Sequence, residues 1–94
     1  MWKDESSFKE VLQEEIEEIT DQIESTESRL QRLRAIHAKV YADYTEIRKK
    51  SLLSSYESRK KETLRKRVSE LSEKIKAETR EIERLERILE EKKL

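Results

Sequence analysis

Apolar residues recur along most of this chain at alternating spacings of four and three. In heptad notation, abcdefg, one run of a and d positions covers residues 12–47 and a second covers residues 64–89. Heptads that persist over several turns are typical of supercoiled α-helices, whose a and d side chains form one apolar seam. The pattern therefore predicts an all-α protein, a long coiled coil.

The predicted seam takes its members from both runs. They are Leu12, Ile16, Ile19, Ile23, Leu30, Leu33, His37, Val40, Tyr44, Ile47, Leu64, Val68, Leu71, Ile75, Ile82, Leu85 and Leu89. Polar Thr26, His37 and Glu78 occupy single a or d positions, where polar residues set the register of a coil. Since burying one Leu or Ile stabilises by about 1.5–3 kcal/mol, the seam must be covered by another helix.

The two runs are out of phase by three residues, and the shift falls within residues 49–62. Either one helix continues through a three-residue stammer, or the chain turns back as a two-helix hairpin. Serines in this stretch favour caps and turns, and Ser54–Glu57 matches the start of a second helix. However, the stretch holds no Gly, Pro, Asn or Asp to end the first helix. We therefore favour the continuous rod, about 140 Å long, with the hairpin as the alternative.

The whole chain, residues 1–94, is predicted to be a single coiled-coil segment. Ser7 and Glu10 match a capping box, so the first helix is predicted to start near Ser6 or Ser7. The predicted parts are a frayed N-terminus at 1–5, a first heptad block at 6–50, a Ser-rich shift or turn at 51–58 and a second heptad block at 59–94.

Composition narrows the class of protein further. Charged residues make up 47% of the chain and hydrophobic residues 33%, and the chain has no Gly, Pro or Cys. Without Gly and Asn, β-hairpin turns are hard to build, and without Cys there is neither a disulfide nor a thiolate metal site. No apolar run reaches the roughly 20 residues that span a bilayer, and no signal-peptide core is present. We expect an intracellular protein, cytoplasmic or nuclear.

Charge is unevenly distributed although the net charge is zero. Residues 1–28 hold ten acidic and two basic side chains, a net charge of −8, and residues 29–66 hold twelve basic and four acidic, a net charge of +8. A parallel in-register pair would stack two acidic segments side by side. The sequence therefore favours antiparallel association with itself, or association with another helical protein.

Candidate catalytic chemistry is sparse. His37, the only histidine, has Arg34 three residues before it, whereas a helical metal site would need a carboxylate there. The acidic run Glu14, Glu15, Glu17 and Glu18 flanks Ile16 on a helix surface, where nothing shifts a pKa for acid–base catalysis. We expect no enzyme activity, no catalytic residue, no metal and no cofactor.

Two groups of side chains are candidate contacts for a partner. A basic cluster comprises Arg48, Lys49, Lys50, Arg59, Lys60, Lys61, Arg65, Lys66 and Arg67. Trp2, Phe8 and Val11 form a candidate N-terminal anchor, since aromatic residues often dominate interfaces. The function predicted is an oligomerising or adaptor coiled coil within a larger assembly. The alternative is a helical module that binds nucleic acid or another polyanion, such as an anionic surface, through the basic cluster.

Overall fold

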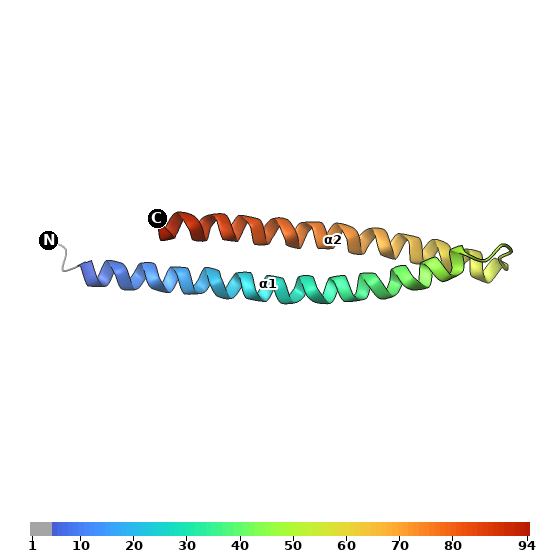
Figure 1. Cartoon of the computed structure of the whole chain (residues 1–94), viewed down its shortest axis with the longest axis horizontal. Helices are drawn as coiled ribbons and strands as arrows, with labels where there is room; N and C mark the ends of the chain where they lie inside the picture. Colours follow the sequence, from blue (N-terminus) through green and yellow to red (C-terminus); the bar gives the residue numbers. More distant parts are fainter. Residues whose placement is uncertain (1–4) are drawn as a thin grey trace.

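The computed structural model of this chain describes residues 5–94, and it shows two long antiparallel helices joined by a short turn (Figure 1). Helix α1 comprises Glu5–Arg48 and helix α2 comprises Ser55–Lys93. The molecule measures 78 × 15 × 15 Å. Of the two predicted alternatives, the chain adopts the hairpin. The preference for a continuous rod of about 140 Å was wrong.

The turn between the helices explains why that preference failed. Helix α1 ends where the Lys50 amide donates to the Ile47 carbonyl at 3.1 Å. This bond joins residues three apart, whereas the bonds of an α-helix join residues four apart. Ser54 then caps α2: its side chain accepts from the Glu57 amide at 3.1 Å, while the Glu57 carboxylate accepts from the Ser54 amide at 3.3 Å. No residue in 5–94 has a positive φ. The turn is therefore made without the left-handed geometry that would require Gly or Asn.

The start of α1 also differs from expectation. The helix already includes Glu5, so Ser7 lies inside its first turn. The predicted start at Ser6 or Ser7 was therefore wrong by one or two residues, a difference that is common at helix ends. Trp2, from the candidate N-terminal anchor, lies outside the described residues.

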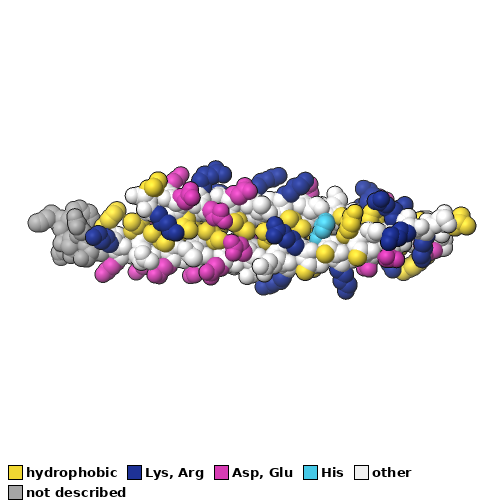
Figure 2. All heavy atoms as spheres, viewed as in Figure 1, with side chains coloured by type: hydrophobic (Ala, Val, Ile, Leu, Met, Phe, Trp, Pro, Cys, Tyr) yellow, Lys and Arg dark blue, Asp and Glu magenta, His cyan; other side chains and the backbone are white. Residues whose placement is uncertain are grey.

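The core is a single line of side chains between the two helices. Leu30, Ile47, Leu71 and Leu85 are buried there, together with the polar Thr26. Figure 2 shows apolar side chains running between two rows of charged ones along the visible face. The seam is thus covered by the second helix of the same chain, and no helix of another chain is needed to cover its inner side.

The two helices are not of equal length. At the open end of the hairpin, Lys92 Nζ donates to Glu15 Oε2 at 2.7 Å, which places the last turn of α2 beside Glu15. The first turns of α1, which carry Phe8 and Val11, therefore extend past the end of α2 (Figure 1).

Candidate interaction surfaces

The predicted seam residues all lie between α1 and α2, and each is buried or half-buried. Most are only half-buried, because two helices cannot enclose a side chain from every direction. Leu71 is the most enclosed, with 1% of its surface exposed. The structure therefore places the seam inside one chain. That the same residues also form a seam between chains remains a prediction.

Polar contacts across the seam hold the two helices at a fixed offset. Arg29 donates across the seam to Glu78 Oε2 at 3.5 Å, and within α1 it donates to Thr26 Oγ1 at 3.2 Å. Further towards the turn, His37 Nε2 lies 3.2 Å from Ser72 Oγ. Thr26, His37 and Glu78 were predicted from their heptad positions. Arg29 and Ser72 were not, because only the antiparallel pairing of the helices reveals what they face.

One long side of the hairpin carries a shallow groove, which we call the groove face. A hollow of about 440 Å³ is lined by Arg29, Arg32, Leu33, Lys74, Ala77 and Glu78. A second hollow of about 160 Å³, lined by Gln22, Ser25, Thr26, Arg29, Glu81 and Leu85, adjoins it at Arg29. Leu33, Ala77 and the aliphatic stems of the long cations make the larger hollow apolar at its base. One turn further along α1, Ile36 is 43% exposed.

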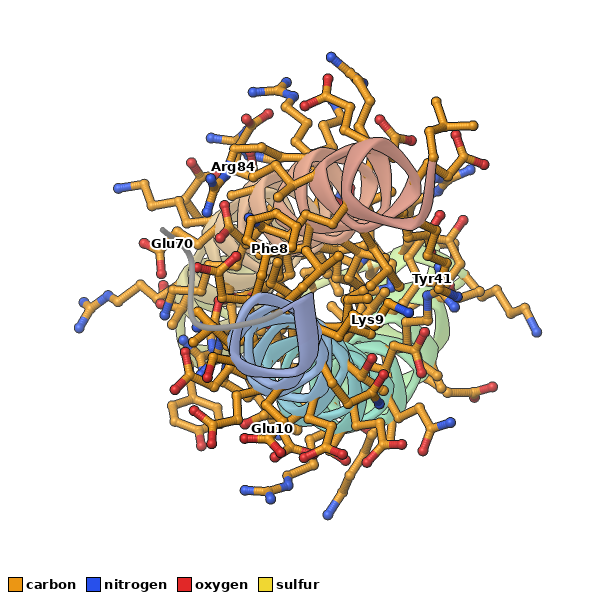
Figure 3. All side chains as sticks on the ribbon, turned by 90° about the vertical axis from the view of Figure 1, so that its left-hand side faces the viewer. Phe8, Lys9, Glu10, Tyr41, Glu70 and Arg84 are labelled. Atoms are coloured by element: carbon orange, nitrogen blue, oxygen red, sulfur yellow. The ribbon has the colours of Figure 1, made fainter. Side chains whose placement is uncertain are left out.

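The opposite long side of the hairpin carries an aromatic pair. The rings of His37 and Tyr41 stack with centroids 6.1 Å apart and planes 8° from parallel. Tyr41 remains 48% exposed. Viewed along the hairpin from its open end, Tyr41 lies on one side and Glu70 and Arg84 on the other (Figure 3). The two long sides are therefore chemically different, and the groove lies on the side away from Tyr41.

The hairpin gathers the whole basic cluster at its closed end. Residues 46–67, the basic tip, hold nine basic and three acidic side chains, a net charge of +6. Each of the three carboxylates is paired with a nearby cation: Glu46 with Lys49, Glu57 with Lys50 and Glu62 with Arg65. The hydrogen bond from Arg65 lowers the pKa of Glu62, and that from Lys50 lowers the pKa of Glu57. At the tip Leu52 is 88% exposed and Tyr56 72%.

The other end of the hairpin has the opposite charge. Residues 7–24 and 84–94, the open end, hold ten acidic and five basic side chains, a net charge of −5. Phe8 and Val11, from the candidate anchor, are 63% and 54% exposed there. Each end thus combines net charge of one sign with exposed apolar side chains. The charge segregation seen in the sequence persists in the fold, because the acidic segment of α1 packs beside a balanced segment of α2.

No group of three or more His, Asp or Glu side chains is placed to hold a metal ion within the described part of the chain. Among the same residues, no helix is long and apolar enough to cross a membrane. Comparison with protein-family models, with curated proteins and with solved structures gave no match. The geometry of these surfaces is therefore the basis for a proposed function.

Proposed function

We propose that this chain is a non-enzymatic coiled-coil module that holds protein chains together in a larger assembly inside the cell. Further helices, from copies of itself or from another helical protein, would cover the parts of the seam that α1 and α2 leave open. The observation that carries the proposal is the incomplete cover of the seam. Within residues 7–94 only Leu30, Ile47, Leu71 and Leu85 are buried hydrophobic side chains.

The hairpin alone has a small apolar core. Small domains bury too little apolar surface to be stable with a wide margin, and two helices side by side bury less than a bundle does. Ile36 and Tyr41 flank the seam with nearly half of their surface exposed. Flanking apolar positions widen the stripe beyond what one partner helix covers, which is typical of helices in bundles of more than two.

The test combines the mass of the isolated chain, from light scattering, with its helix content and unfolding temperature. We expect either an assembly of two or more chains, or a single chain that is poorly folded until a helical partner is added. An unfolding temperature that rises with protein concentration would support self-assembly. A single chain that is fully helical and stable at every concentration would contradict the proposal, because its seam would then need no further cover.

Binding of nucleic acid or another polyanion is the second candidate, and the observation in its favour is the basic tip. The turn brings all nine cations of the cluster to one end of the hairpin. Contacts with phosphates weaken steeply as salt rises, because releasing bound counterions into a more concentrated solution gains less entropy. Binding of a DNA duplex that disappears between 50 and 500 mM salt, with assembly unchanged, would favour this candidate.

A further inference from the structure

We propose that the partner covering the groove face is a second copy of this chain, placed antiparallel to the first so that the two hairpins form a four-helix bundle. The proposal rests on the assembly function above and specifies its partner, its surface and its direction. Three independent features of one hairpin point to the same pairing: the spacing of the groove-face residues, the charges of the two ends, and the exposed apolar side chains.

The groove face is laid out symmetrically about its centre. Arg29 of α1 and Glu81 of α2 line the same hollow. The hydrogen bond from Arg84 lowers the pKa of Glu81, and the nearby cation of Arg29 adds to this effect. Ile36 lies seven residues beyond Arg29, and Ile88 lies seven residues beyond Glu81. Because the helices are antiparallel, these two isoleucines lie on opposite sides of the central layer.

A twofold axis through that central layer makes the face complementary to itself. The axis is perpendicular to the helices and sets each helix against its own copy. Ile36 of one hairpin then lies in the same layer of the bundle as Ile88 of the other, diagonally across the core. Arg29 of one hairpin and Glu81 of the other share the central layer in the same way. Such an isologous interface is closed after two copies, which limits growth to a dimer. Ile36 is 43% exposed in the single hairpin, and Ile88 is half-buried.

The same axis brings unlike ends together. Arg29 contacts Glu78, so Glu81 is level with Thr26 and the axis passes between residues 27 and 28 of α1. Residues 47–50 at the tip of one hairpin then lie level with residues 5–8 at the open end of the other. A net charge of +6 then lies beside a net charge of −5 at both ends of the pair. Exposed Phe8 and Val11 then lie at the same end of the pair as exposed Leu52 and Tyr56. Parallel pairing would instead bring like charges together at both ends, which is unfavourable.

The area available is sufficient for a stable pair. One long side of a molecule of 78 × 15 Å offers a footprint of about 1,000 Å². Stable protein interfaces bury about 800 Å² on each partner. A pair held along its groove faces therefore falls within the usual range without any change in the fold of either hairpin.

Substitutions on opposite sides of α1 test which face is used. Ile36→Glu should weaken dimerisation at least tenfold in sedimentation equilibrium, because it places a carboxylate in the apolar layer that Ile36 shares with Ile88 of the other copy. Tyr41→Glu is the matched control: Tyr41 is on the other long side and has a similar exposed fraction, 48% against 43%. It should change the dimer constant less than threefold. Equal losses from both variants, or a loss from Tyr41→Glu alone, would overturn the assignment of the face.

Disulfide trapping tests the direction, and the chain is suited to it because it contains no cysteine. Ser51→Cys places a thiol at the tip and Phe8→Cys places one at the open end, at the heptad position of Arg29 and Ile36. In a thiol-buffered equilibrium, we expect the mixture of the two variants to form a mixed dimer, and each variant alone to stay reduced. Lys76→Cys, on the outer surface, gives the background from random collisions. Tip-to-tip disulfides from Ser51→Cys alone would overturn the antiparallel pairing.

Charge reversal separates pairing between copies from binding of a polyanion. Lys60→Glu with Arg67→Glu at the tip, or Glu10→Lys with Glu14→Lys at the open end, should each weaken dimerisation about tenfold at low salt. The variant that carries all four substitutions should dimerise nearly as well as the unaltered chain, because both ends are reversed. If the variant with all four substitutions dimerised no better than the two double variants, with helix content unchanged, the role of the ends would be overturned.

The outcomes also separate this inference from the function on which it rests. A poorly folded single chain would overturn pairing with a second copy while leaving the assembly proposal in place, since a different helix would then be needed. A stable single chain would overturn both. An oligomer trapped with its tips together would overturn only the antiparallel pairing.

Discussion

Residues of the same type in this hairpin differ widely in how much of their surface is buried. Leu71 and Leu94 are both leucines of the second half of the chain, yet one is 1% exposed and the other 104% exposed. The heptad pattern predicted Leu71 as a seam residue. It did not show that Leu71 is more enclosed than its neighbours, which depends on which side chains of α1 face it.

At this scale we expect Leu71→Ala to destabilise the chain by about 2–5 kcal/mol, the usual range for a buried leucine. Leu94→Ala should change the free energy of unfolding by no more than about 0.5 kcal/mol, because its side chain is in solvent. Urea unfolding followed by circular dichroism measures both. A similar loss in the two variants would show that Leu71 is not enclosed by α1.

Among the elements, the turn is the one that decided the fold. Ser54 and Glu57 cap α2 reciprocally, and Lys50 of the turn bonds the same Glu57 carboxylate. The sequence predicted this cap as one of two interpretations. The continuous rod was favoured over the hairpin because helix ends were expected to need Gly or Asn. This turn instead uses only ordinary backbone angles.

The cap predicts a response to acid. Lys50 and the Ser54 amide lower the pKa of Glu57 below its ordinary value of 4.5. Because the folded pKa is the lower one, the stabilisation is present above pH 4.5 and is lost as pH falls through the folded pKa. We expect hydrogen exchange of the amides around Ser54–Ser58, expressed relative to the intrinsic exchange rate at each pH, to accelerate as pH falls below 4.5.

Two variants serve as controls for that acid response. Glu57→Gln should remove the acceleration, because the titrating carboxylate is gone. Ser54→Ala should lower stability by about 1 kcal/mol at neutral pH, the typical loss for an N-cap. An acid response that is unchanged in Glu57→Gln would assign it to other carboxylates.

Over the whole molecule, the important property is the separation of charge and of exposed apolar side chains to the two ends. The sequence already contained the charge blocks, and it favoured antiparallel association because of them. In the hairpin the basic cluster collects at the turn, while the acidic block remains at the open end (Figure 2).

Small-angle scattering tests the fold at this scale. A single hairpin, and an antiparallel pair that overlaps fully, should both have a longest dimension of roughly 80 Å, close to the 78 Å of the structure. They differ in mass, which light scattering on the same sample gives. A particle near 140 Å long would contradict the hairpin and support the continuous rod.

The sequence by itself determined that the chain is helical, where its apolar seam lies, and which residues interrupt that seam. Heptad spacing settles these because the period of a helix dictates which side chains share a face. The tertiary structure decided that the second helix of the same chain covers the seam, that Arg29 and Ser72 complete the polar layers, and that nine cations share one end. The physical reason is that these depend on the direction of one helix relative to the other. That direction is set by the six-residue turn between the helices. In the sequence this turn appears only as a shift of three residues in the heptad pattern, and a continuous rod with a stammer would show the same shift.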